Sequence, residues 1–113
     1  CIRDRFGGIQ PTLDFYHWMR SLGKTVWMGG MFDTGVSKRM HAAFATLPGM
    51  DLPPDVSDYS AYFSHDTALP PLELEYGELV LNAPKNPVGL GCILDKEYLK
   101  SIAIDEVTVT TEG

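Results

Sequence analysis

The first fifty residues predict an order of elements that few folds accommodate: a helix, one short strand, a glycine loop and a second helix. Apolar residues recur at helical spacing over residues 12–22 and 36–46, and residues 24–28 between them have the pattern of a short buried strand. This alternation is typical of βαβ units and parallel sheets. One strand cannot form a sheet, however, and an open α/β half exposes both apolar helix faces. The pattern therefore predicts an α/β fold that further strands complete.

Each predicted helix has a recognisable end. Gly23 follows the first helix as a C-cap, and Pro48-Gly49 stops the second. The second helix is predicted to direct four apolar residues inward, namely Met40, Ala43, Phe44 and Leu47.

The second half of the chain has a different character. Residues 51–71 are rich in loop-forming residues, and residues 72–82 alternate weakly around Gly77, which predicts a hairpin. A short helix is predicted over residues 95–101, and a terminal strand rich in β-branched residues over residues 102–110. The chain does not begin with Met, which suggests a processed or truncated product.

Composition limits the classes of partner. Nine Lys and Arg stand against fifteen Asp and Glu, a net charge of −6, and the basic residues form no stripe. Nucleic-acid binding needs clustered cations, so we expect no nucleic-acid partner. The apolar stretch over residues 25–32 is too short to span a bilayer, so we expect no membrane partner. Cys1 and Cys92 make no disulfide or metal-binding framework, and a cytoplasmic location is the expectation.

Several stretches together resemble one family. Residues 26–35, Val-Trp-Met-Gly-Gly-Met-Phe-Asp-Thr-Gly, are similar to the end of the seventh barrel strand in the muconate-lactonising subgroup of the enolase superfamily. Residues 5–8 resemble the turn after the sixth strand, residues 42–49 the seventh helix and its exit, and residues 52–55 the start of the eighth strand region. Residues 77–92 resemble the segment of o-succinylbenzoate synthases and N-acylamino acid racemases that returns to the cap domain.

The resemblance implies the C-terminal part of a (β/α) barrel, about strands six to eight, over residues 1–66, and a return segment that packs on the cap domain over residues 67–113. Catalytic groups of such barrels lie at the C-terminal ends of the strands. Members of this family abstract the proton α to a carboxylate while Mg²⁺ stabilises the enediolate, in cycloisomerase, racemase or dehydratase reactions. The Mg²⁺ ligands belong to strands three to five. The resemblance therefore implies Mg²⁺ in the full-length parent, an isomerase or lyase, and no metal ligand in this fragment, which alone is inactive.

The resemblance also implies site residues. Asp33 matches the family's acid at the end of strand seven, usually Glu, which contacts the base or the region of the substrate carboxylate. Aspartate is one methylene shorter than glutamate, so its reach differs. Gly30, Met31 and Thr34 belong to the same motif and are the expected substrate-binding residues.

The position of the family's general base is a departure from its pattern. A lysine is expected five residues before the first glycine of the Gly7-Gly8 turn, and Ile2 stands there. Isoleucine cannot exchange a proton, and the neighbouring arginines are poor bases because their pKa is above about 12. Asp4 is the chemically plausible substitute and the second expected catalytic residue.

Two of these features also have purely structural interpretations. Asp33 directly precedes a predicted helix and could cap it or close an Asx turn. Gly29-Gly30 could cradle an anion at a helix N-terminus, although close packing at a barrel mouth is the favoured explanation.

The histidines carry a weaker signal. His17 and His41 lie within predicted helices, where a lone histidine is more often a surface or satisfied residue than a ligand. His65 and Asp66 are adjacent in a loop, but no nucleophile stands beside them, so a catalytic pair is disfavoured.

Two other functions stay open. A non-catalytic protein derived from the same barrel is favoured by Ile2 at the base position. A small independent α/β module that binds an anion at residues 29–35 predicts a chain that folds alone, whereas a fragment predicts exposed apolar helix faces. The expected partners of the parent enzyme are a small carboxylate substrate, the missing N-terminal portion of the same protein, and further copies in a homo-oligomer.

Overall fold

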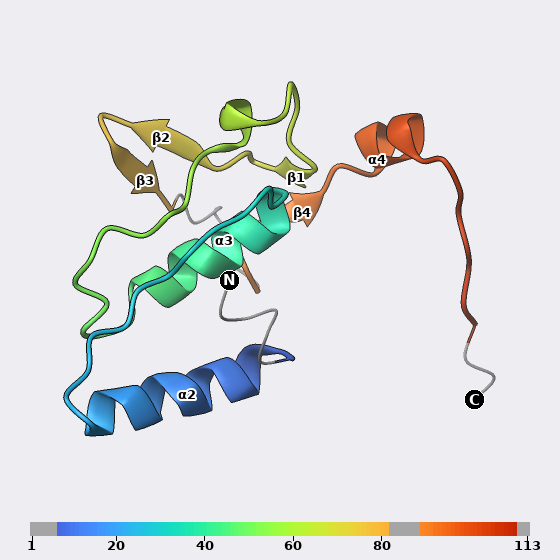
Figure 1. Ribbon diagram of the computed structural model, residues 1–113. Helices are drawn as coiled ribbons and strands as arrows, with labels where there is room; N and C mark the ends of the chain where they lie inside the picture. The colour runs from blue at the N-terminus through green and yellow to red at the C-terminus, as the bar shows by residue number, and fades with distance from the viewer. Residues whose placement is uncertain (1–6, 82–88, 111–113) are drawn as a thin grey trace.

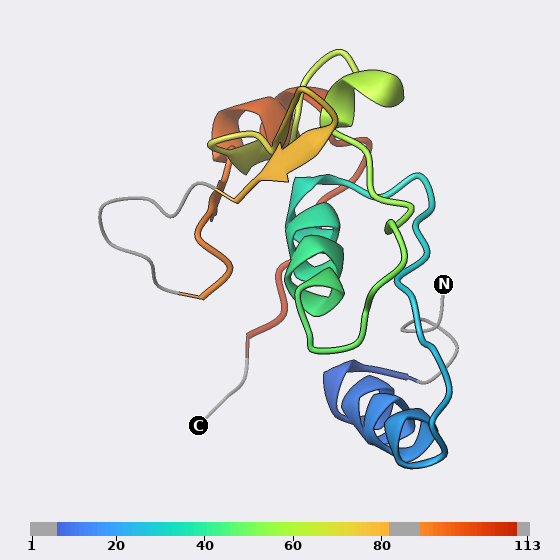
Figure 2. The ribbon, with the colours of Figure 1, turned by 90° about the vertical axis from the view of Figure 1, so that its left-hand side faces the viewer.

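The computed structural model describes residues 7–81 and 89–110 of the chain (Figure 1). Its elements are α2 (Ile9–Ser21), α3 (Gly35–Ala45), the 3₁₀ helix η1 (Tyr59–Ala61), β1 (Ala68–Leu69), β2 (Glu73–Glu75), β3 (Glu78–Val80), β4 (Ile93–Leu94) and α4 (Lys96–Ile102). Both views show the short strands on one side of α3 and helix α2 on the other (Figures 1 and 2). Helix α3 therefore stands between α2 and the strands.

Helix α2 ends where the sequence predicts. Gly23 adopts a φ of +64°, and its N–H donates to the carbonyl of Arg20 at 3.0 Å. This is the left-handed conformation that glycine reaches without a Cβ penalty. Tyr16 is buried, and its hydroxyl donates to the Pro48 carbonyl at 2.7 Å. The bond ties the middle of α2 to the turn that follows α3.

Helix α3 buries polar side chains as well as apolar ones. Phe44 is buried as predicted, and two of the other residues predicted to face inward are half-buried. Ala43 is exposed, so that part of the prediction was wrong. Lys38, Arg39 and His41 are buried instead, each at 3% exposure or less. Apolar periodicity misplaced the inward face because these polar side chains find partners on neighbouring loops.

Residues 24–28 are extended but form no strand, so the predicted strand was wrong as an element. Val26 and Met28 are buried, and Trp27 between them is 44% exposed, which is the alternation that a strand produces. Within the described chain, one backbone hydrogen bond joins this segment to a distant one, from Asp55 N to Met28 O at 2.9 Å. A strand is defined by a ladder of such bonds. The segment has the shape of a strand without neighbouring strands beside it.

The hairpin predicted around Gly77 is present. Strands β2 and β3 pair antiparallel, with Leu74 opposite Leu79. Tyr76 and Gly77 between them have φ values of +51° and +85°, which suits the two-residue turn of a twisted hairpin. A second antiparallel pair, β1 with β4, was not predicted, because two-residue strands show no periodicity that a sequence can reveal.

The C-terminal part matches the prediction for its helix and contradicts it for its strand. Helix α4 lies within a residue of the predicted range, with the side chain of Asp95 accepting from Tyr98 N as N-cap. Residues 103–110 are not a strand, and Ile104, Val107 and Val109 are at least 80% exposed. Figure 1 shows this stretch leading away from the rest of the chain. Its β-branched residues favour a strand, but no segment of the described chain pairs with it.

The chain is more open than a compact domain of its size. Its accessible surface is 8175 Å², against about 6200 Å² expected for a compact protein of this mass. The radius of gyration is 15.9 Å, against about 13 Å expected. Much apolar surface therefore stays outside the core. No helix in the described ranges is long and apolar enough to cross a membrane.

Candidate functional site

The loop over residues 29–34 joins the extended segment to helix α3 and contains most of the expected site residues. Met31 is 62% exposed, and Thr34, the N-cap residue of α3, is also exposed. Gly30 is half-buried, and a Cβ at this position would overlap the carbonyl oxygen of Asp55. That oxygen belongs to the backbone, so glycine is required here for close approach. Close packing, the favoured interpretation of the glycine pair, therefore holds at Gly30.

Asp33 is held by its own loop and by helix α3. Its Oδ2 accepts a hydrogen bond from Met31 N at 3.1 Å and lies 3.4 Å from Nδ1 of His41. The side chain of Asp33 is 13% exposed and that of His41 is 2% exposed. Thr34 is the N-cap residue of α3 and makes no side-chain capping bond. The carboxylate reaches back to residue 31, which differs from an Asx turn, where the acceptor bonds a later N–H.

The N-terminus of α3 is covered by a carboxylate of the chain itself. Asp66 is 5% exposed, and a Cβ on Gly35, the first residue of α3, would lie 2.7 Å from its Cγ. Asp66 Oδ1 also accepts from Ala68 N at 3.3 Å. The positive end of the helix dipole stabilises an anion at this place. The carboxyl group of Asp66 already occupies this position, which weighs against the binding of an external anion here.

Lys38 projects from the first turn of α3 into a polar environment. Its Nζ donates to the Asp58 carbonyl at 2.6 Å and to Ser57 Oγ at 3.2 Å, and lies 5.2 Å from the centre of the Tyr62 ring. Burial lowers the pKa of Lys38 below its usual value of 10.5, and nearby carboxylates, that of Asp58 foremost, oppose the effect by raising it. These bonds hold the loop after residue 55 against the start of α3.

Arg39 does the same for the segment that follows. Its Nη2 donates to the carbonyl of Pro70 at 2.7 Å and more weakly to that of Pro71 at 3.4 Å. Lys38 and Arg39 were missed as structural residues, because adjacent basic residues on a helix normally indicate a solvated face. For Lys38 the sequence does hold a signal, because helical spacing places residues 34, 38 and 41 on one face of the helix.

His65 and Asp66, adjacent in sequence, point to different partners. His65 Nε2 lies 3.2 Å from Asp95 Oδ2, and its ring lies 4.3 Å from the ring of Tyr98. The bonds from Tyr98 N, foremost, and from His65 lower the pKa of Asp95. The two residues are adjacent in sequence but have different partners in the structure. His65 contacts Asp95, which is the N-cap residue of α4.

Exposed aromatic rings lie beside the loop of Asp33. The rings of Phe32 and Tyr62 meet edge to face at 4.8 Å, and that of Phe63 follows at 6.5 Å from Tyr62. Phe32 is 72% exposed and Tyr62 51% exposed. The sequence analysis missed Phe32, although it stands between two predicted site residues.

The remaining site expectations concern the base and the metal. Asp4 and Ile2 lie outside the described residues. Within the described ranges, no three His, Cys, Asp or Glu side chains gather in a way that could hold a metal ion. The described residues therefore provide no Mg²⁺ site.

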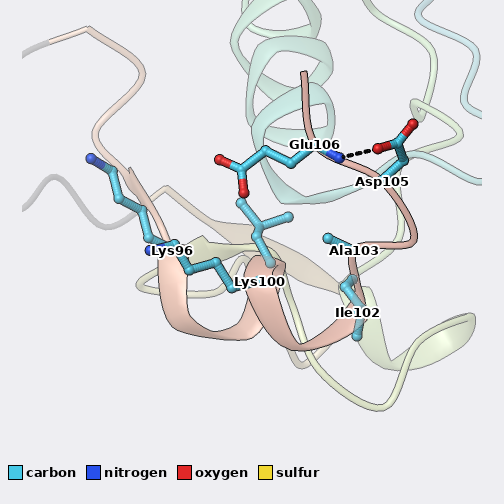
Figure 3. A pocket seen from close by; sticks show the side chains of 7 residues that line it. Lys96, Lys100, Ile102, Ala103, Asp105 and Glu106 are labelled. Atoms are coloured by element: carbon cyan, nitrogen blue, oxygen red, sulfur yellow. Dashed lines mark hydrogen bonds between the residues drawn. The ribbon is translucent and has the colours of Figure 1, made fainter. Parts of the chain in front are cut away.

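A groove of about 690 Å³ lies between α4 and the chain that follows it (Figure 3). The groove takes none of its lining from the loop over residues 29–34, and it is lined by Lys96, Leu99, Lys100, Ile102, Ala103, Asp105 and Glu106. Helix α4 forms one wall of the groove and the exposed stretch after it forms the other, so the shape of the groove depends on the position of that stretch.

Comparison with known proteins identifies the fold class to which these α/β elements and the glycine loop before α3 belong. No protein-family profile matches the chain. An enolase-superfamily member from Listeria innocua of known structure superposes with a TM-score of 0.74 at 32% identity, over 84% of this chain and 25% of its own. The chain belongs to the enolase superfamily, and its α/β fold corresponds to the C-terminal part of such proteins.

Within that superfamily, the chain is similar to two kinds of named protein. It is 28% identical to the o-succinylbenzoate synthase of Bacillus subtilis over 109 residues, 96% of this chain and 29% of the relative. It is 33% identical to the N-succinylamino acid racemase of Thermus thermophilus over 100 residues, 88% of this chain and 26% of the relative. The chain thus spans between a quarter and a third of the length of these relatives.

Proposed function

We propose that this chain is the C-terminal part of an enolase-superfamily enzyme that abstracts the proton α to a carboxylate. Residues 1–66 contribute the last part of the (β/α) barrel, and residues 67–113 return to the cap domain. The names of the relatives support a dehydratase or racemase outcome, of the o-succinylbenzoate synthase or N-succinylamino acid racemase kind. Mg²⁺ is held by residues outside this chain, and the fragment alone turns nothing over.

The observation that carries the proposal is the placement of Asp33. A carboxylate held at two points by Met31 N and His41 stands in a loop whose other side chains are open to solvent. In a barrel enzyme, a loop that follows a strand and starts a helix lies at the catalytic face. Asp33 and Asp4 are the proposed catalytic residues, and the proposed substrate-binding residues are Gly30, Met31 and Thr34.

The openness of the chain supports its completion by the rest of a longer protein. Residues 24–28 alternate buried and exposed side chains like a strand with no neighbour, and the apolar residues of the terminal stretch are uncovered. Apolar surface of this extent promotes association. The isolated chain is therefore expected to self-associate, which sedimentation velocity over a range of concentrations measures.

The experiment uses the complete native gene product that contains this sequence. Dehydration to o-succinylbenzoate and racemisation of N-succinylamino acids are assayed with and without Mg²⁺ after chelator treatment. Asp33→Asn is expected to lower kcat/KM by about 10- to 100-fold, because a mispositioned or uncharged group at the reacting centre loses transition-state stabilisation. Asp14→Asn, an exposed carboxylate on α2, is the matched control and leaves kcat/KM unchanged.

Three outcomes contradict the proposal. Turnover that survives complete removal of divalent metal rules out the metal-assisted chemistry. Equal activity of the Asp33 and Asp14 variants removes Asp33 from the site. Absence of turnover with both substrate classes favours the non-catalytic barrel protein instead. The homo-oligomer and the cytoplasmic location are part of the same proposal, and sizing of the native product tests the first.

A further inference from the structure

His41 is the side chain of helix α3 that reaches the candidate catalytic loop. It is 1% exposed, and its Nδ1 lies 3.4 Å from Asp33 Oδ2. The same oxygen accepts the hydrogen bond from Met31 N. One anchor therefore comes from within the loop, and the other comes from a rigid helix two turns further along the chain.

We propose that His41 is a positioning residue, which orients the Asp33 carboxylate through its Nδ1–H. This inference rests on the proposed function of Asp33. A neutral or charged histidine donates to a carboxylate oxygen only through a nitrogen that carries a proton, so this role of His41 requires a proton on Nδ1. Because the ring is buried, water does not compete for this contact, and the interaction is stronger than it would be at the surface.

The described contacts of Asp33 differ in what they are attached to. The bond from Met31 N is local to the loop and moves with it. Neighbouring residues Met31 and Phe32 are more than 60% exposed, so burial does little to fix this part of the loop. The ammonium of Lys38 attracts the Asp33 carboxylate electrostatically. Among the described contacts, the one with His41 relates the carboxylate directly to helix α3.

The test compares three replacements of His41 in the complete native protein. Asparagine can place an amide N–H close to the position of Nδ1, glutamine places its amide near Nε2, and leucine offers no donor. We expect His41→Leu and His41→Gln to lower kcat/KM by about 10- to 100-fold, mostly through kcat, since misplacement of a reacting group by about 1 Å has effects of this size. His41→Asn should stay within about threefold of the native enzyme.

The rescue by asparagine separates positioning from folding. His41→Asn leaves a larger cavity than His41→Leu, which nearly fills the space of the ring, so a merely structural role predicts a loss for asparagine at least as large as that for leucine. Equal kcat/KM values for these two variants overturn the proposal. Native kcat/KM in His41→Leu also overturns it, because the Asp33 carboxylate would then be oriented without His41.

A second measurement does not depend on catalysis. Nitrogen-15 chemical shifts of the imidazole report which nitrogen carries the proton, and we expect Nδ1 in the native protein and a loss of this preference in Asp33→Ala. If turnover is absent but the tautomer shifts as expected, the proposed function fails while the contact stands. If the tautomer is Nε2–H in the native protein, the positioning role is wrong whatever the activity.

Discussion

Substitution of Gly35 by alanine tests how closely Asp66 covers the start of helix α3. The new Cβ would overlap Asp66 Oδ1 and lie 2.5 Å from Oδ2, so the carboxylate must withdraw by about 1 Å to reach an ordinary contact of about 3.5 Å. Overpacking of this kind costs about 1–3 kcal/mol. Alanine returns up to about 1 kcal/mol through its higher helix propensity. We expect a net loss of about 1–2 kcal/mol in the free energy of unfolding.

The same substitution should change sign when Asp66 is absent. In an Asp66→Ala background no carboxylate opposes the new Cβ, so Gly35→Ala should be neutral or stabilise by up to about 1 kcal/mol. The coupling energy of the two sites is then about 1–3 kcal/mol. Urea denaturation of the native gene product and its three variants measures each corner of this cycle.

A second glycine provides the control for the cycle. Gly23 has a φ of +64° and nothing near its Cβ direction, so Gly23→Ala costs about 1–2 kcal/mol through backbone strain alone. That cost should be equal with and without Asp66. If Gly35→Ala shows the same loss in both backgrounds, the contact between Asp66 and the helix start is refuted, together with the account of an internally occupied anion site.

Three further predictions concern stability. Tyr16→Phe removes the bond to the Pro48 carbonyl and should lower the free energy of unfolding by about 1 kcal/mol, measured by urea denaturation; no change would mean that water replaces the hydroxyl fully. Because the pKa of Asp95 is lowered in the folded state, its charge stabilises α4 above the unfolded value of about 3.8 and this contribution disappears as pH falls through the folded value. Hydrogen exchange at α4 should then show that the native chain and Asp95→Ala converge at low pH, and a pH-independent difference would contradict this reasoning. Burial lowers the pKa of Lys38, so the folded state loses this proton at a lower pH than the unfolded state does. The native chain should therefore gain stability relative to Lys38→Met as pH rises toward 10.5, measured by urea denaturation. A difference in the free energy of unfolding that does not change with pH would contradict the lowered pKa.

The sequence predicts those elements whose signals are local. The C-cap at Gly23, the turn at Gly77 and the short helix after Asp95 each depend on residues within a few positions, and each is present. The failures occur where a distant partner decides. Residues 24–28 and 103–110 have the composition of strands, but a strand also needs a neighbour, which the described chain does not provide.

The candidate site follows the same division. Asp33 was identified from its motif, yet its partner His41 was interpreted as a surface or satisfied helical residue. Helical periodicity places residues 34, 38 and 41 on one face, so the loop, Lys38 and His41 could have been grouped from the sequence. Asp66 and Gly35 are 31 positions apart in the sequence, and no local pattern predicts that they lie close together.

Three described contacts of the loop over residues 29–34 and of Lys38 lie within residues 30–58. Gly30 packs on Asp55, Asp33 meets His41, and Lys38 binds the backbone of Asp58. None of these contacts requires the strands that a complete barrel would add. The apolar surface that does require them lies elsewhere, along residues 24–28 and 103–110. In the proposed enzyme the polar contacts therefore set the geometry of the loop, and the rest of the protein supplies the stability and the metal-binding groups that let this geometry act.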